Sequence, residues 1–335
     1  MSALRTLFIG GTGVISSACV RAAVTAGHEV TVVTRGRSRQ RPPPDGVRAL
    51  EADARDAEAL RGVLRGVLGD ERFDVVASFI GYSASDVAVD LEVFAGRTDQ
   101  YVFISTCSVY AHPAAVLPLR ESAARSAPLF EYPANKIVCE DLLLAAHRTT
   151  GFPVTIVRPA HVYDRTTLPL LAGWTAVERM RQCRPVVVHG DGTSLWNLMH
   201  ADDFARAFVP LLGNPRAVGE AVHVTSSELI TWDQIHLAVA RAAGVEPVLV
   251  HRSSEDIGRV VEWMDVVLRE DFRHSVLYDR SRLGDLVPGF AEQYTVASGM
   301  RETVEWFDAD PARRTVDESL DEAFDVLAGT RAPVG

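Results

Sequence analysis

The sequence is almost without lysine: it holds one, Lys136, against 33 arginines in 335 residues. On a solvated surface both side chains keep the charge, so replacing one by the other costs little. The exchange is costly only where a compact ammonium on a flexible stem is required. Lys136 is therefore either a chance survivor or the mark of a position that cannot accept arginine.

Three other kinds of feature are scarce. No apolar run reaches the roughly 18 residues of a membrane span, and the opening MSALRTLFIGG lacks the basic region and long apolar core of a signal peptide. The few cysteines form no CxxC pair and no metal-ligand spacing, which predicts reduced thiols, no metal site and a cytoplasmic location. They are Cys19, Cys107, Cys139 and Cys183.

Positive charge is also in deficit. The net charge of −10 and the pI of about 5.5 repel phosphate backbones, so we expect no nucleic-acid partner. Apolar and charged contents of 47% and 23% are typical of a globular protein with an ample core.

The first half alternates short apolar runs with helical patterns. This predicts an α/β fold, a Rossmann-type doubly wound parallel sheet. We expect a dinucleotide-binding domain over 1–165, with returning segments near 185–213 and 221–225, and a smaller, interleaved substrate-binding lobe over 166–335. Strands are expected at 4–9, 29–35, 47–50, 74–79, 100–105 and 153–158, and helices near 56–67, 86–96, 133–149, 201–213, 231–243, 293–308 and 316–328.

A glycine-rich turn follows the first strand and opens a helix, with the sequence GGTGVIS. Gly10 suits the tight turn, and Gly13 lets the backbone approach a pyrophosphate at the helix N-terminus. Ser16 stands where a third glycine is usual, and a small residue there can still pack helix on strand. The turn predicts dinucleotide binding by Gly10, Thr12, Gly13, Val14 and Ile15, the alternative being a flavodoxin-like turn.

The end of the second strand favours NADP over NAD. NAD sites often place an acid there for the ribose 2′-hydroxyl; this chain has Thr34-Arg35-Gly36-Arg37. A guanidinium suits a 2′-phosphate, although Arg39 and Arg41 also make a solvated basic loop a possible interpretation.

The lone lysine follows a tyrosine by four residues, in EYPANK. On a helix, Tyr132 and Lys136 share one face. A phenol with a pKa of about 10 is a poor base at neutral pH, and a nearby ammonium would lower that pKa. Arginine's wider fork would displace both groups.

The Tyr132–Lys136 pair resembles the YxxxK active site of the short-chain dehydrogenase/reductase family. Together with GGTGVIS, its order and spacing resemble the extended branch, the NAD-dependent epimerase/dehydratase family, over most of the chain. The segments EADARD, VFISTCSVYA, IVRPAHVYD, HADDFARAF and GEAVHVTSSELITWDQI match further landmarks. The resemblance implies that Asp53 contacts adenine and that Thr106 is the catalytic hydroxyl, and it places Ala54, Phe79, Gly81, Pro159 and Val162 at the cofactor.

The implied chemistry is hydride transfer at a substrate carbinol carbon. Tyr132 would move the hydroxyl proton as general acid or base. Lys136 would tune Tyr132 and hold the nicotinamide ribose, and Thr106 would bond the substrate oxygen. The alternative for Thr106 is a strand-end hydroxyl that caps backbone.

Several positions depart from the family pattern. Cys107 and Ser108 replace the Asp-Glu pair of the sugar 4,6-dehydratases, so a dehydratase of that design is not expected; Glu121 is interpreted as a solvated loop carboxylate. His161 and Trp196 replace an Asn and an Arg of the nucleotide-diphosphate sites, which favours a substrate with less phosphate. These four positions, Cys107, Ser108, His161 and Trp196, are the candidate substrate contacts.

His200, Asp202 and Asp203 stand at an expected helix start, where Asp capping is preferred to a metal site. Among activities on a sugar-like substrate, epimerase ranks first, then a keto-sugar reductase or dehydrogenase, then an atypical dehydratase. A cofactor-sensing regulator and an RNA-binding relative are the non-enzyme alternatives. A homodimer is expected from the resemblance alone.

Overall fold

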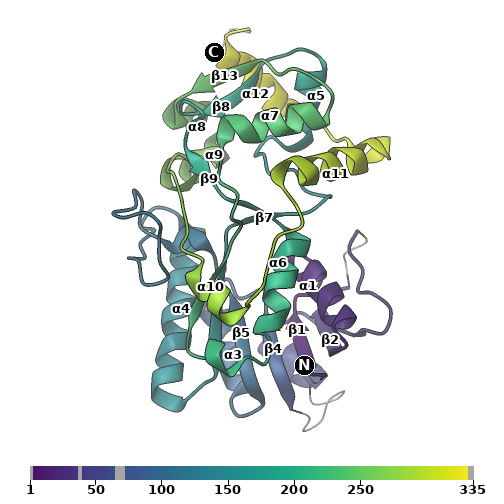
Figure 1. Cartoon of the computed structure of the whole chain (residues 1–335), viewed down its shortest axis with the longest axis vertical. Coiled ribbons are helices and arrows are strands. Elements are labelled where there is room, and N and C mark those ends of the chain that lie inside the picture. The colour runs from purple at the N-terminus through teal and green to yellow at the C-terminus, as the bar shows by residue number, and fades with distance from the viewer. Residues whose placement is uncertain (1–2, 37–39, 65–71, 331–335) are drawn as a thin grey trace.

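The computed structural model describes residues 3–36, 40–64 and 72–330. A sheet-containing part and a smaller lobe lie one above the other, with the N-terminus at the sheet and the C-terminus in the lobe (Figure 1). None of the helices in these ranges combines the length and the hydropathy needed to cross a membrane.

In the described part of the chain, seven parallel strands form the large sheet, in the order β11-β6-β5-β4-β1-β2-β3. Thr6 of the first strand, β1, lies opposite Val30 on one side and Val75 on the other. The sequence order reverses between β1 and β4, which creates the crevice where such sheets bind ligands. The expected α/β doubly wound fold is confirmed. The strands are β1 (Arg5–Ile9), β2 (Glu29–Thr34), β3 (Arg48–Glu51), β4 (Phe73–Ser78), β5 (Thr98–Ile104), β6 (Val154–Pro159) and β11 (Ala221–Val224).

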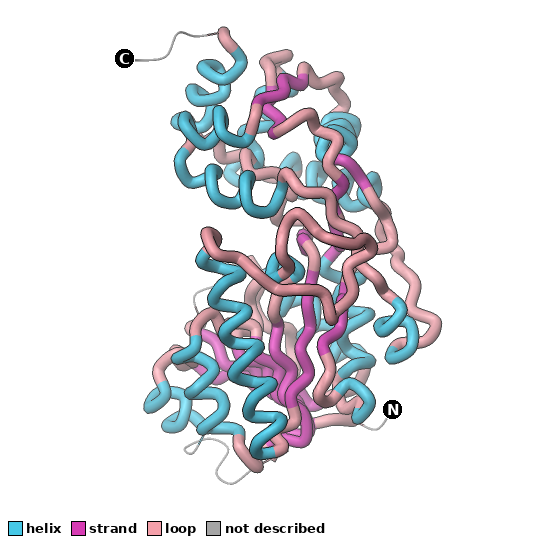
Figure 2. Tube along the Cα trace, turned by 90° about the vertical axis from the view of Figure 1, so that its left-hand side faces the viewer, coloured by secondary structure: helices cyan, strands magenta, loops and turns pink. Residues whose placement is uncertain are grey.

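Helices cover both faces of this sheet (Figure 2). On one face α1 (Val14–Thr25) packs against α6 (Ala201–Phe208), and their apolar side chains form one core with the sheet. On the other face α3 (Ala84–Phe94) packs against α4 (Glu131–Thr150), and a second core includes α2 (Ala57–Val63). Because both faces are buried, the strands are nearly continuous apolar runs.

The lobe has its own core, centred on Trp232, Phe272 and their aromatic neighbours. Its helices are α5 (Gly173–Arg181), α7 (Trp232–Ala242), α8 (Ser254–Val260), α9 (Glu262–Val267), α11 (Val296–Asp308) and α12 (Glu318–Ala328), while α10 (Ser281–Leu286) lies against β11. Short strands pair as β7 (His161–Tyr163) with β10 (Leu198–His200), β9 (Leu195–Trp196) with β12 (Ile230–Thr231), and β8 (Val186–His189) with β13 (Leu249–Arg252).

Two features of the second half differ from expectation. We expected the segment 185–213 to return to the large sheet. Its strand β8 pairs with β13 instead, and α6 is the part of this segment that packs on the sheet. Helix α5 was not predicted. Its inward side chain Arg179 is buried and bonds Asp321 and Asp325 of α12 at 2.7 and 2.8 Å, so a charged residue interrupts the apolar stripe that marks a helix.

A buried ion pair fixes α4 to the sheet. Arg158 of β6 donates to both oxygens of Glu140 on α4, at 2.9 and 2.6 Å, and Glu140 is fully buried. Arg158 also donates to the Tyr110 hydroxyl at 2.7 Å. Glu121 belongs to the same region, because its carboxylate accepts the His223 backbone N–H at 3.1 Å; interpreting it as a solvated loop carboxylate was wrong.

Candidate active site

The phosphate turn lies between β1 and α1. Gly10 has a φ of +85°, and a Cβ there would lie 2.4 Å from Ile80 Cγ2, so glycine is required. A Cβ at Gly13 would meet only Ser16 Oγ, at 3.3 Å. Ser16 is buried and its hydroxyl accepts the Gly13 N–H at 2.8 Å, so serine in the third-glycine position stabilises the turn.

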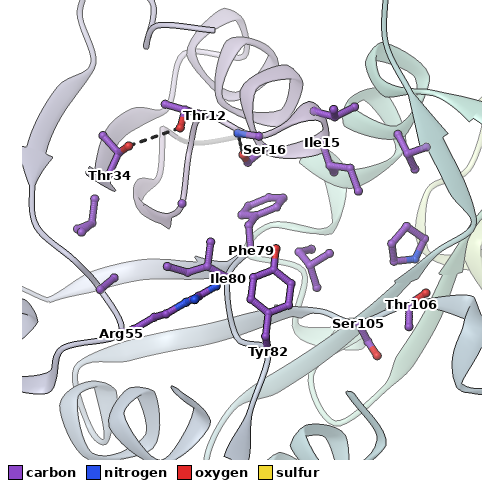
Figure 3. A pocket seen from close by; sticks show the side chains of 18 of the residues that line it. Thr12, Ile15, Ser16, Thr34, Arg55, Phe79, Ile80, Tyr82, Ser105 and Thr106 are labelled. Carbon is purple, nitrogen blue, oxygen red and sulfur yellow. Dashed lines mark hydrogen bonds between the residues drawn. The ribbon is translucent and has the colours of Figure 1, made fainter. Parts of the chain in front are cut away.

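A cavity of about 470 Å³ runs from this turn across the sheet edge. Figure 3 shows Phe79, Ile80 and Tyr82 between the Thr12–Thr34 end and the Thr106 end. Its lining includes Gly10, Thr12, Gly13, Val14, Ile15, Thr34, Arg35, Asp53, Ala54, Phe79, Thr106, Tyr132, Lys136, Pro159 and Val162. Of the predicted cofactor residues only Gly81 does not line it.

The residues present fit a dinucleotide. The glycine turn offers backbone beside the positive end of α1, where pyrophosphate binds. Apolar side chains such as Phe79 and Ile80 line the middle of the cavity, and polar side chains line both ends. The cavity extends from Asp53 to Thr106, and this span would hold the adenosine of the cofactor at the Asp53 end and its nicotinamide at the Thr106 end.

At the Asp53 end, Arg35 is exposed and lines the edge of the cavity. Arg37 and Arg39 lie outside the described residues. Arg41 is engaged elsewhere: its guanidinium bonds Asp164 at 2.8 Å and holds the pKa of that carboxyl below its usual range. Sequence reasoning missed Arg55, which lines the cavity with its guanidinium 5.2 Å from the Tyr82 ring centroid. Its position, two residues after the expected cofactor contact Asp53, could have identified it.

Lys136 is held by backbone. Its Nζ donates to the carbonyls of Gly81 at 2.7 Å and Ile104 at 2.8 Å, at the ends of β4 and β5. The rings of Tyr82 and Phe103 each lie 4.7 Å from the same nitrogen. Burial lowers the pKa of Lys136 to about 8. Gly81 thus serves the site through its carbonyl oxygen.

Tyr132 differs from expectation. Burial raises its pKa to about 12, with the nearby Tyr82 as a second cause, and Lys136 does not produce the expected lowering. Although 41% of the residue is exposed to the cleft, the surrounding atoms still desolvate the phenol. The ammonium of Lys136 faces the two carbonyls instead, and the phenol of Tyr132 is neutral.

Of the two interpretations of Thr106, the structure shows the backbone cap, and the catalytic role stays a prediction. Its hydroxyl accepts the Ser108 N–H at 3.2 Å, which caps a short 3₁₀ turn at Cys107–Val109. Its nearness to the Tyr132 phenol counteracts part of the rise in the phenol's pKa. Thr106 and Tyr132 stand where the first cavity meets a second one.

This second cavity, of about 250 Å³, lies between the sheet and the lobe. Cys107 borders it but is buried, with its thiol donating to the Arg158 carbonyl at 3.3 Å; burial raises its pKa, so no thiolate forms. His161 accepts the Trp196 indole N–H at 3.2 Å, and burial lowers the pKa of His161 to about 4. Trp196 in turn packs on Trp232 and Phe272, which leaves little of its face for stacking.

Sequence reasoning also missed Asp271. This buried residue lies on a π-helical turn of the lobe, Leu268–Phe272, and accepts a hydrogen bond from Ser108 Oγ at 2.7 Å. Burial raises its pKa to about 6. Ser108 stands at one of the two positions where the sugar 4,6-dehydratases carry their Asp-Glu pair. The lobe therefore places the Asp271 carboxyl beside that position.

His200, Asp202 and Asp203 are structural. The helix cap is His200, whose Nδ1 accepts the Asp202 N–H at 3.2 Å, rather than an aspartate. Asp202 bonds Arg21, and Asp203 accepts the backbone N–H groups of Gln293 and Tyr294. Over the described ranges, no group of three His, Cys, Asp or Glu side chains has the arrangement of a metal site.

Comparison with known proteins agrees with this architecture. A model of the NAD dependent epimerase/dehydratase family matches residues 6–225. The chain is 31% identical over 303 residues to 2'-dehydrokanamycin reductase of Streptomyces kanamyceticus, covering 87% of this chain and 81% of the relative. It is 28% identical over 313 residues to the chloroplast stem-loop binding protein of 41 kDa b of Arabidopsis thaliana, covering 88% and 79%.

Among solved structures, the epimerase Mth375 of Methanothermobacter thermautotrophicus superposes with a TM-score of 0.76 at 17% identity, over 93% of this chain and 94% of that one. This likeness shows the fold. The family match spans the glycine turn, the Tyr132–Lys136 pair and β11, and it therefore covers both the sheet and the Thr106 end of the cavity. The chain belongs to the NAD-dependent epimerase/dehydratase family.

Proposed function

We propose that the protein interconverts a hydroxyl and a keto group on a sugar-like substrate with NADP(H), and that it works as a keto-sugar reductase. One observation carries this proposal: Tyr132 and Thr106, which both bear hydroxyls, line both cavities and therefore stand at their boundary. A carbonyl oxygen placed there would meet two donors while its carbon faces the cofactor cavity.

The cofactor, when bound, supplies the hydride. Thr106 orients the substrate oxygen, and Tyr132 gives it a proton, which its raised pKa keeps available at neutral pH. Lys136 has three N–H donors and uses two on carbonyls, so the third is free for a ribose hydroxyl in the cavity. The lobe closes the substrate side through Asp271 and its neighbours.

The direction of reduction is supported by the neutral phenol and by the 31% identity to a reductase. An epimerase is the second candidate, supported by the fold shared with the epimerase Mth375. Denaturing the freshly purified protein and identifying any released nucleotide by mass separates them. We expect an empty protein that binds added NADPH; a nucleotide retained at one per chain would favour the epimerase.

The preference for NADP rests on Arg35. We expect Arg35→Ala to weaken NADPH binding about 10-fold or more, because a charge-assisted hydrogen bond to a 2′-phosphate is worth about 1.5–3 kcal/mol. NADH binding should hardly change. Fluorescence titration with both cofactors measures this, with exposed Arg148→Ala on α4 as control. Equal losses for NADH and NADPH would contradict the preference.

A homodimer is part of the proposal. Val138 and Leu142 lie one turn apart on α4, with exposed fractions of 46% and 38%, and give that helix an apolar outer stripe. Light scattering on the eluting protein gives its mass in solution. RNA binding, suggested by the plant relative's name, is opposed by the charge of −10, and a salt-sensitive gel shift would support it.

A further inference from the structure

The second cavity contains an unusual set of charges for a family with sugar-nucleotide relatives. None of its lining residues, all of them described, is Arg or Lys. Its histidine, His161, is neutral because burial lowers its pKa to about 4, and Tyr132 and Tyr278 are phenols with raised pKa values. Asp271 therefore supplies the full charge that the lining carries above pH 6.

Asp271 is poorly satisfied where it stands. The residue is 4% exposed, and its Oδ2 accepts one hydrogen bond, from Ser108 Oγ at 2.7 Å. Its Oδ1 lies 3.6 Å from Nε2 of His112, beyond hydrogen-bonding distance. Burial and the stacked His274 keep His112 neutral, with a pKa of about 4, and neither ring nitrogen of His112 has a hydrogen-bond partner among the described residues.

A buried carboxylate without a cation is costly, and one removed from water needs several donors. An ammonium placed in the cavity would supply both charge and donors in a charge-assisted hydrogen bond. A diphosphate would instead bring negative charge to a cavity that has no basic side chain to receive it. The negative charge of this cavity therefore favours a positively charged substrate over a phosphorylated one.

We propose that the substrate carries a protonated amine and that Asp271 recognises it. The inference rests on the proposed function of the same site and names its substrate class, an amino sugar or aminocyclitol. Ser108, which holds Asp271, is two residues from Thr106, and all three residues line one cavity of about 250 Å³. The amine and the reacting carbon accordingly belong to one ring or to two adjacent rings.

Binding, measured by isothermal titration calorimetry on the full chain, tests this inference. The probes are kanamycin, a polyamine glycoside, and its fully N-acetylated form, which keeps the skeleton but loses the charge. The variants are Asp271→Asn, which preserves shape and can still accept from Ser108, and Glu270→Gln, which removes a charge one residue away that does not line the cavity. Thermal unfolding confirms that each variant is folded.

We expect the wild type to bind kanamycin at least 10-fold more tightly than the acetylated form. Asp271→Asn should weaken kanamycin binding about 10- to 100-fold and leave the acetylated form unchanged, whereas Glu270→Gln should keep the preference. Equal or absent binding of both probes by the wild type, or an Asp271→Asn variant that keeps the preference, overturns the inference. Amine preference without any NADPH-dependent turnover would instead overturn the proposed function.

Discussion

Tyr132→Phe is expected to lower kcat by about 10²- to 10⁴-fold, the range that a positioned general acid contributes. The change removes one oxygen atom and leaves the ring that lines both cavities. Among the described residues that line both cavities, Tyr132 alone has a titratable side chain, and in the proposed mechanism it gives a proton to a substrate oxygen held by Thr106. Steady-state reduction of a keto sugar, followed by loss of NADPH absorbance, measures kcat.

The same variant should bind NADPH normally and unfold at the wild-type temperature, because the phenol makes few other contacts. Tyr294→Phe is the matched control, since Tyr294 packs on His200 outside both cavities. Turnover of Tyr132→Phe within a few-fold of wild type would show that another group donates the proton. If the protein were instead a cofactor-sensing regulator, Tyr132→Phe would leave its regulatory output unchanged.

Lys136→Arg is expected to lose most activity, about 100-fold or more in kcat/KM, and to unfold more easily. Lys136 is 2% exposed, with two carbonyls and two aromatic rings around its ammonium. The larger guanidinium must displace some of them, and overpacking of this kind costs about 1–3 kcal/mol. Thermal unfolding and cofactor titration, made side by side with turnover, separate the loss of stability from the loss of function.

Lys136→Met isolates the contribution of charge. Methionine keeps an unbranched chain of similar reach, and since burial lowers the pKa of Lys136 to about 8, removing the ammonium relieves a desolvation cost. We expect this variant to be folded and inactive. Arg148→Lys on the exposed end of the same helix is the control for an exchange of the two cations. Near-normal turnover in Lys136→Arg would mean that the lone lysine is a product of compositional drift.

The sequence predicted the sheet and the phosphate turn well because their signals are local. Alternating apolar runs, a glycine turn such as Gly10–Gly13 and a four-residue spacing can each be recognised within a short window. The pKa of Tyr132 could not be predicted in the same way. It depends on which atoms surround the phenol and on the two backbone carbonyls that engage Lys136, and neither is encoded in a motif.

Asp271 illustrates a second limit. It is 163 residues from Ser108 in the chain and stands on a short π-helical turn that has no distinctive pattern. Only the packing of the lobe on the sheet brings the two residues together. Helix α5 was missed for a related reason, because its buried Arg179 is satisfied by carboxylates on a helix about 140 residues later.

The Glu140–Arg158 pair has a consequence for catalytic precision. Tyr132, Lys136 and Glu140 follow one another at four-residue intervals, so they lie along one stripe of α4. The charged clamp at Glu140 holds that stripe against β6, whose end, Pro159, borders both cavities. A helix that cannot slide or rotate keeps the phenol and the ammonium at a constant distance from the reacting atoms. In the proposed mechanism the buried pair would preorganise the site, so that no reorganisation of α4 would be needed in each turnover.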